Sequence, residues 1–358
     1  MSRFASDPEP ARGLVIKYTE CRLFLEDETM TQWKMISMAV LFLGFCSAGM
    51  ADDRLAVTME IQEWDVPYEE PRTRDPWVGG EDSIWFVGQR THFVGRFTPS
   101  TETFERFDLE DGSGPHTVIA NQHGVWYAGN RAAHLGRLDP ETGAIEKFHP
   151  PGDGPRDVHT LASISDGRIW FTEQGGNRVG VFDPQDESFE MHELSTERAR
   201  PYGIVVHDDQ PWVVTLGTNQ LLTVVDGELK EIELPREATR SRRLAVASDG
   251  QVWYADYANG YVGRYAPESD DIKEWRAPSA EQSRPYAVTM DANDVFWIVE
   301  TGVEPNVFVG FDTGEQRWSE SFAVPGGAGT VRHMVYDADS HSIWFGTDRT
   351  TIGQARID

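Results

Sequence analysis

The stretch Ile169-Trp170-Phe171-Thr172-Glu173, followed by Gln174-Gly175-Gly176-Asn177-Arg178-Val179-Gly180, decides the fold of this chain. It sets a tryptophan in an apolar, β-prone run and follows it with a turn rich in glycine and asparagine. The same arrangement recurs at Trp85, Trp126, Trp170, Trp212, Trp253, Trp297 and Trp344. A period of 41 to 47 residues carried by short strands is typical of a β-propeller. We therefore predict an all-β, seven-bladed β-propeller.

The third repeat shows the expected content of one blade most clearly. An inner strand, 158–164, is followed by the turn 165–167 and then by the tryptophan strand. Because Asp166-Gly167 stands between two apolar runs, it favours a hairpin. Two more strands, 178–184 and 189–194, complete a four-stranded blade. We expect the seven tryptophans to pack between blades, and the glycine that recurs in the third strand to allow close backbone approach.

The two ends of the repeat region predict how the ring closes. The run 60–66 has the pattern of a fourth strand, such as 272–275, whereas the chain ends at 351–358 in the pattern of a third strand. We therefore expect the N-terminal strand to join the last blade, which leaves no long sheet edge exposed. Residues 52–358 would then form a single propeller.

The first 51 residues read as an N-terminal extension with a signal peptide. Met30–Lys34 precedes the apolar run 35–45, and small residues follow up to Ala51. This order is typical of secretory signals, so Met30 is a candidate for the true start. The protein is expected to be periplasmic or secreted, without a membrane anchor after cleavage. N-terminal sequencing of exported material should begin at Asp52.

Composition excludes several classes of partner. The chain has 32 Lys and Arg against 59 Asp and Glu, a net charge of −27. Nucleic acids and anionic membranes need the opposite balance, so neither is an expected partner. Both cysteines, Cys21 and Cys46, precede the repeats, which therefore have no thiol chemistry. We expect an acidic monomer that binds a small molecule or a cyclic peptide.

Candidate site residues lie at two places in each blade, about eleven residues before the tryptophan and three after it. In the third blade these places bring together Asp157, His159 and Glu173. A three-residue turn would set His159 opposite Glu173, whereas a two-residue turn would point them to different faces. Two carboxylates beside an imidazole can hold a hard divalent cation and leave the imidazole as a base. The alternative is that Glu173 and its counterparts Asp256 and Glu300 are solvated strand ends.

Three segments resemble the virginiamycin B lyase (streptogramin B lyase) family: 169–180, Arg200-Pro-Tyr-Gly-Ile204 and Arg284-Pro-Tyr-Ala-Val288. The resemblance extends from about residue 58 to 358. It implies a seven-bladed propeller and a magnesium-assisted elimination that opens a cyclic depsipeptide at its ester without water as nucleophile. Resistance to such antibiotics could be incidental to the physiological role.

The resemblance also implies roles for individual residues. Asp157 and Glu173 would hold Mg²⁺, and His159 would act as the general base. His116 would orient the substrate or assist the departing group. The remaining expected substrate-binding residues are Tyr202, Tyr286, Arg242 and Arg243.

The order of the blades departs from the family pattern. The family's histidine blades are the last two in the chain, whereas here they are the second and third. Without rotation, Tyr286, Val331 and Thr347 take the places of the first histidine and the two acids, and only His333 matches. Two other functions therefore stay open. One is a non-catalytic exported propeller that binds a peptide, glycan or protein, and the other is a metal-dependent lactonase.

Overall fold

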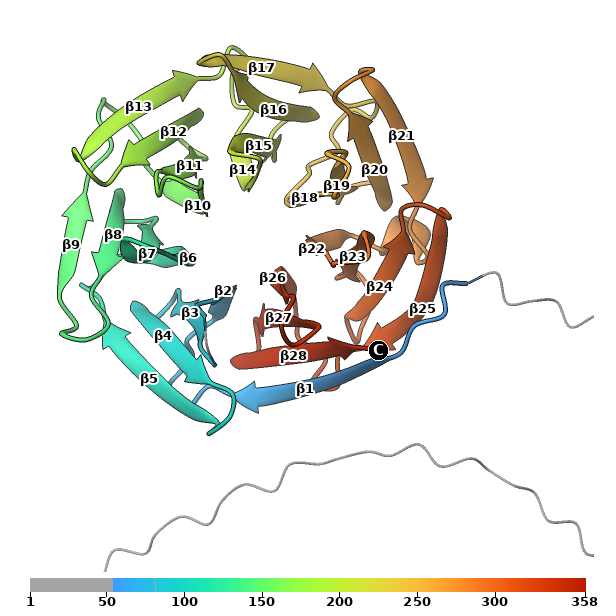
Figure 1. The fold of residues 1–358 in the computed structure, drawn as a ribbon, viewed down its shortest axis with the longest axis horizontal. Coiled ribbons are helices and arrows are strands. Elements are labelled where there is room, and N and C mark those ends of the chain that lie inside the picture. Colours follow the sequence, from blue (N-terminus) through green and yellow to red (C-terminus); the bar gives the residue numbers. More distant parts are fainter. Residues whose placement is uncertain (1–53, 81) are drawn as a thin grey trace, which may run out of the picture. The chain divides into compact units, whose positions relative to one another are not determined.

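The computed structural model describes residues 54–80 and 82–358, and these form a ring of seven four-stranded antiparallel sheets (Figure 1). The all-β, seven-bladed propeller expected from the tryptophan period is thus confirmed. The predicted signal peptide and the start at Met30 lie outside the described residues. Within the described part of the chain, the one helical element is the short 3-10 helix η1 (Ala280–Gln282), and no helix could cross a membrane.

Each blade runs outward from an inner strand beside the central channel to an outer strand at the rim (Figure 1). The first three blades are β2 (Thr73–Val78), β3 (Ile84–Gly88), β4 (Phe93–Thr98) and β5 (Thr103–Asp108); β6 (Pro115–Asn121), β7 (Gly124–Gly129), β8 (His134–Leu138) and β9 (Ile145–Phe148); and β10 (Val158–Ser163), β11 (Ile169–Glu173), β12 (Arg178–Asp183) and β13 (Ser188–Glu193). The next three are β14 (Pro201–His207), β15 (Gln210–Thr215), β16 (Gln220–Val225) and β17 (Glu228–Glu233); β18 (Leu244–Val246), β19 (Val252–Asp256), β20 (Tyr261–Ala266) and β21 (Asp271–Arg276); and β22 (Pro285–Met290), β23 (Val295–Glu300), β24 (Val307–Asp312) and β25 (Arg317–Ala323).

The seventh blade contains both ends of the described chain. It consists of β26 (Val331–Asp337), β27 (Ser342–Thr347), β28 (Thr351–Ile357) and, outermost, β1 (Met59–Asp65). β1 pairs antiparallel with β28 through seven residue pairs, from Met59 with Ile357 to Asp65 with Thr351. The first strand thus completes the last blade, as the sequence pattern predicts.

The repeated tryptophans are core residues. All seven are buried, with at most 8% of the side chain exposed. Trp126 of the second blade, for example, packs with Ile169 and Phe182 of the third. Contacts of this kind join each sheet to the next, so the tryptophans act in packing between blades, as expected.

The recurring glycine of the third strand has a specific partner. It pairs with an aromatic residue of the tryptophan strand, and the aromatic ring lies over the glycine Cα. The pairs are Phe86 with Gly95, Tyr127 with Gly136, Phe171 with Gly180, Tyr254 with Gly263 and Phe345 with Gly353. A Cβ at Gly136 would lie 2.1 Å from the Tyr127 ring, so any larger residue must displace this ring.

Replacing Gly136 with alanine is therefore expected to lower the free energy of unfolding by about 1–3 kcal/mol, the usual cost of overpacking a core. Gly314 is a matched control, because it lies in an exposed turn where a Cβ would meet only the Asp312 carboxylate, at 3.5 Å. Denaturant unfolding of both variants tests this. Equal midpoints for Gly136→Ala and Gly314→Ala would contradict the role given to the ring.

Candidate functional site

A register shift near the start of the inner strands turns side chains toward the channel. Strands β6, β10, β14, β22 and β26 each have this shift, between Pro115 and Val118, Val158 and Leu161, Pro201 and Ile204, Pro285 and Val288, and Val331 and Met334. In β2 it falls between Arg74 and Trp77, and in the fifth blade Arg242 and Arg243 directly precede β18. β-bulges re-aim side chains in this way and are common beside functional sites.

In β6, β10, β14, β22 and β26 two consecutive residues occupy the shift. We group these residues with Arg74 and Asp75 of the first blade and with Arg242 and Arg243 of the fifth, and call the two sets the upper and the lower layer. The upper layer contains Arg74, His116, His159, Tyr202, Arg242, Tyr286 and Arg332. The lower layer contains Asp75, Thr117, Thr160, Gly203, Arg243, Ala287 and His333, of which Gly203 has no side chain and Ala287 packs in the core of the sixth and seventh blades. A strand without the shift would send only alternate residues to one side.

The upper layer is a connected ring of cationic and aromatic groups. Arg74 Nη2 lies 2.8 Å from His116 Nε2, and the His116 and His159 rings lie 3.6 Å apart between centroids. His159 contacts Tyr202 at 4.1 Å, and the Tyr202 hydroxyl lies 2.6 Å from that of Tyr286. These contacts join five blades.

Two arginines complete the upper layer. The Arg242 guanidinium lies over the rings of Tyr257 and Tyr286, with its Cζ 4.0 and 4.6 Å from their centroids. Arg332 lies over Tyr286 and pairs with Asp348, its Nη2 being 2.7 Å from Oδ2. Burial opposes ionisation of the Tyr286 phenol, but the surrounding guanidinium groups outweigh burial and lower its pKa to about 8.

Asp75 holds the two layers together. Its Oδ2 accepts hydrogen bonds from Arg243 Nη2 at 2.5 Å and from the Thr117 hydroxyl at 3.0 Å. Its Oδ1 accepts from Arg74 Nε at 3.3 Å. Burial would raise the pKa of this carboxyl, but Arg243 and Arg74 outweigh burial and hold it well below its usual range. A buried carboxylate between two guanidinium groups is the electrostatic centre of the channel.

The imidazoles of the channel are neutral. Burial and the charge of Arg74 hold the pKa of His116 well below its ordinary value, and burial with Arg243 does the same for His159. Burial and Arg243 lower the pKa of His333 to about 3. No described residue is hydrogen-bonded to the buried Nδ1 of His333.

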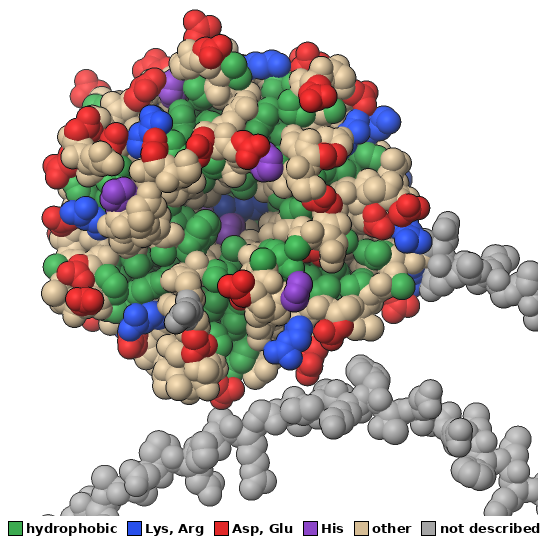
Figure 2. Space-filling view, in the orientation of Figure 1, with side chains coloured by type: hydrophobic (Ala, Val, Ile, Leu, Met, Phe, Trp, Pro, Cys, Tyr) green, Lys and Arg blue, Asp and Glu red, His purple; other side chains and the backbone are tan. Residues whose placement is uncertain are grey.

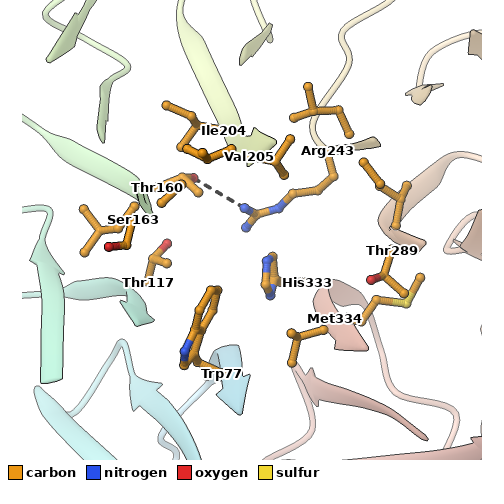
Figure 3. A pocket seen from close by; sticks show the side chains of 17 residues that line it. Trp77, Thr117, Thr160, Ser163, Ile204, Val205, Arg243, Thr289, His333 and Met334 are labelled. Atoms are coloured by element: carbon orange, nitrogen blue, oxygen red, sulfur yellow. Dashed lines mark hydrogen bonds between the residues drawn. The ribbon is translucent and has the colours of Figure 1, made fainter. Parts of the chain in front are cut away.

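Next to the lower layer lies a cavity of about 240 Å³. Its walls are mostly apolar and include Trp77, Ile204, Val205, Leu244, Val288 and Met334. Its polar groups include Arg243, His333, Thr117 and Thr160. Figure 3 shows the Arg243 guanidinium and the His333 ring reaching toward the middle of this cavity from different blades. In the space-filling view the centre of the ring is hollowed, with basic and histidine side chains at the bottom (Figure 2).

The expected metal ligands lie apart from this network. Asp157 accepts hydrogen bonds from the backbone N–H groups of Gly175, at 2.7 and 2.9 Å, and of Gly176, at 3.2 Å. Glu173 is buried, and its Oε2 accepts from Arg178 Nε at 2.8 Å. Its strand partner is Val158, because the register shift follows Val158. The three-residue turn is present, yet His159 does not lie opposite Glu173.

Acids at the place three residues after the tryptophan bind local partners in other blades as well. Asp256 accepts hydrogen bonds from the backbone and side-chain N–H groups of Asn259. Glu300 accepts from the backbone N–H and the hydroxyl of Ser279. The carboxylate at this place thus bonds a nearby loop or strand. The alternative of solvated strand ends for Glu173, Asp256 and Glu300 is wrong, because all three are buried.

The contacts of Asp157 and Glu173 show whether these residues fit a Mg²⁺ ion. Arg178 places a positive charge at the Glu173 carboxylate, where a cation would bind, and like charges repel. Glu173 Oε1 is left without a partner, and burial raises the pKa of this carboxyl to about 6. The described residues include no group of three or more His, Cys, Asp or Glu that could hold a metal. These residues do not fit Mg²⁺, so no chemical step below passes through it, and the assignment stays a prediction.

The structure brings together six of the eight residues that the sequence singled out. His116, His159, Tyr202, Tyr286, Arg242 and Arg243 belong to the two layers, whereas Asp157 and Glu173 do not. Tyr202 and Tyr286 are buried at 5% and 1% exposure and bond to each other across the channel. Asp75 was not among the predicted residues. Its signal was the pair Arg74-Asp75 in a strand expected to be an inner one.

Known proteins of the same shape include lyases and a peptide-binding propeller. The fold resembles selenomethionine-substituted virginiamycin B lyase from Staphylococcus aureus, at 21% identity and a TM-score of 0.75, over 84% of this chain and 99% of that one. A catalytically inactive form of the same enzyme with quinupristin is 20% identical, with a TM-score of 0.76, over 84% of this chain and 99% of that one. YCF48 bound to D1 peptide is 10% identical, with a TM-score of 0.67, over 83% of this chain and 96% of that one. At these identities the structures show the fold alone.

Comparison of the sequence with family models identifies the family of the chain. No curated protein matches it. The family model described as virginiamycin B lyase matches residues 47–307, well over half of the sequence. This agrees with the tryptophan-strand motif and with the two Arg-Pro-Tyr segments. The chain belongs to the virginiamycin B lyase family.

Proposed function

We propose that this chain is a ligand-binding propeller that holds a small organic molecule in its central cavity without turnover. The observation that supports this most directly is the cavity, where apolar walls surround a few convergent polar groups from several blades. Such cavities at the centre of a fold are the usual form of small-molecule sites. Export, which the N-terminal sequence predicts, is part of this proposal.

The electrostatics of the channel favour binding over catalysis. A general base works best when its pKa is near the operating pH. The imidazole that lines the cavity, His333, has a pKa of about 3, and His159 is buried with a pKa well below its ordinary value. Neutral imidazoles of this kind are good hydrogen-bond partners and weak bases.

A thermal-shift screen with small organic molecules tests the proposal. Val205 is half-buried in the cavity wall, so Val205→Phe fills the cavity and leaves the charged groups in place. A ligand at a hundred times its Kd should raise Tm by roughly 2–4 °C in the parent protein and not in Val205→Phe. Mass spectrometry should recover the ligand unchanged. Equal shifts in both proteins, or chemical conversion of the ligand, would contradict a non-catalytic site in this cavity.

A second candidate is the elimination that the family resemblance implies, opening a cyclic depsipeptide or related ester. One observation favours it: His116, His159 and Tyr202 come from three successive blades in the implied order, and their rings are in contact. In that reaction His159 would take the proton next to the carbonyl while the carbon–oxygen bond breaks. The low exposure of His159, 4%, weighs against its access to a substrate.

Incubation with quinupristin over a range of MgCl₂ concentrations tests this candidate. Elimination opens the ring with no change of mass, whereas a lactonase adds one water, so chromatography with mass spectrometry separates the two reactions. If elimination occurs as the resemblance implies, His159→Ala abolishes it and His333→Ala does not. Loss in His333→Ala alone would favour the alignment without blade rotation. Intact quinupristin under all conditions would remove this candidate.

A further inference from the structure

The charges around the channel are strongly unbalanced. Among the fourteen residues of the two layers there are four arginines and one acid, Asp75, while the imidazoles are neutral. Arg332 is the one of these arginines whose ion pair, among the described residues, is with an acid outside the layers, Asp348. This excess of positive charge lies in the middle of a chain whose net charge is −27. Burying a charge without a partner is unfavourable, so the channel has an electrostatic demand for an anion.

Arg243 is the arginine that can meet this demand from the cavity. Its three nitrogen atoms donate to Asp75 Oδ2, to the Thr160 hydroxyl at 3.4 Å and to the Arg332 carbonyl at 3.3 Å. A guanidinium has five N–H groups, so one N–H on each terminal nitrogen has no partner among the described residues. The two terminal nitrogens of one guanidinium can together donate to the two oxygens of a carboxylate. Arg74 is bonded in the same way, to Asp75, Gln89 and His116, but it does not line the cavity, whereas Arg243 does.

The size and the walls of the cavity limit what the anion can be. A volume of about 240 Å³ corresponds to roughly eight water molecules, more than a chloride or a phosphate needs. The walls beyond Arg243 and His333 are apolar, formed by residues such as Trp77, Val288 and Met334. One available guanidinium favours a single negative charge. The His333 ring lines the same cavity beside Arg243 (Figure 3).

We propose that the central cavity binds a small monocarboxylate with an apolar body, its carboxylate paired with Arg243 and its body against Trp77 and the aliphatic walls. This inference rests on the proposed function and specifies the class of ligand. It assigns Arg243 as the residue that selects for charge and the apolar wall as the part that selects for length.

Calorimetric titration of the full chain with acetate, butyrate, hexanoate and phenylacetate tests the inference. Phenylacetamide, which has the same shape and no charge, is the matched ligand control. Affinity should rise roughly fourfold for each methylene buried, and phenylacetate should bind at least tenfold more tightly than phenylacetamide. Inorganic phosphate should not compete at the concentrations at which hexanoate binds.

Two variants separate the possible outcomes. Arg243→Met should abolish carboxylate binding, whereas Arg276→Met, in an exposed arginine that pairs with Glu281 outside the two layers, should retain it. Thermal melting of both variants confirms that each is folded. Phenylacetamide binding as tightly as phenylacetate, or carboxylate binding that survives Arg243→Met, would overturn the inference while leaving a cavity ligand in place. Absence of binding by every compound, with Val205→Phe indistinguishable from the parent, would overturn the proposed function itself.

Discussion

Replacing Asp75 with asparagine is expected to lower the free energy of unfolding by about 3–5 kcal/mol, the usual cost of removing one partner from a buried ion pair. The side chain keeps its size but loses the charge that Arg74 and Arg243 both contact. Two buried guanidinium groups then have no carboxylate between them. Denaturant unfolding followed by circular dichroism measures the loss. Asp166→Asn is the control, because Asp166 is exposed and surface ion pairs contribute little.

The dependence of this effect on pH has a defined sign. Because Asp75 has a folded-state pKa well below its usual range, its stabilising contribution is present above the unfolded-state pKa and is lost as the pH falls through the folded-state value. The difference between parent and Asp75→Asn should therefore be constant near neutrality and shrink below about pH 4. The double variant Asp75→Asn/Arg243→Met should lose less free energy of unfolding than the two single variants lose together, because the second change removes a guanidinium that the first leaves unpaired. Strict additivity would show that the two residues are not coupled.

Removal of β1 is expected to have the second large effect. A chain starting at Pro67 lacks the seven residue pairs with β28. It also lacks Trp64, whose ring stacks on Trp344 at 5.7 Å, and Glu63, which accepts hydrogen bonds from the Thr351 hydroxyl and the Gly326 N–H. The free edge of β28 would then be available to pair with other molecules. We expect Tm to fall by about 10 °C or more and the protein to associate.

A chain starting at Arg54 is the comparison, because it retains every described strand. Circular dichroism melting and size-exclusion chromatography of the two truncations isolate the contribution of β1. A monomer starting at Pro67 that melts at the same temperature as the one starting at Arg54 would show that β1 is not needed to close the ring.

The blades could be predicted from the sequence because each repeat carries the same local signals. A tryptophan in an apolar run, a turn with Asp-Gly or Asn and a glycine in the next strand give strand, hairpin and close approach independently of the rest of the chain. The role of the glycine required the structure. Only the register of Tyr127 with Gly136 reveals that an aromatic ring occupies the space of the missing side chain.

The site was less predictable because its geometry depends on an irregularity. Counting from the tryptophan located His116, His159 and Tyr202, yet strict alternation gave no reason to include Asp75 and Thr160. The register shift turns two neighbouring residues of a strand toward the channel, and the same shift separates His159 from Glu173. Residue types and spacing do not distinguish a bulged inner strand from a regular one. The sequence therefore could not show that the expected metal ligands, Asp157 and Glu173, lie apart from the residues of the channel.

Pairing of the first strand with the last has a consequence for biosynthesis. Met59 and Ile357 are partners, so a nascent chain contains one strand of the four-stranded last sheet almost 300 residues before the ribosome has made the strand that pairs with it. Contacts of such high sequence separation form slowly. The ring cannot close until β28 has been made, and until then the early blades have an unpaired edge. Chaperones that shield strand edges should therefore influence the yield of this protein more than they influence its final stability.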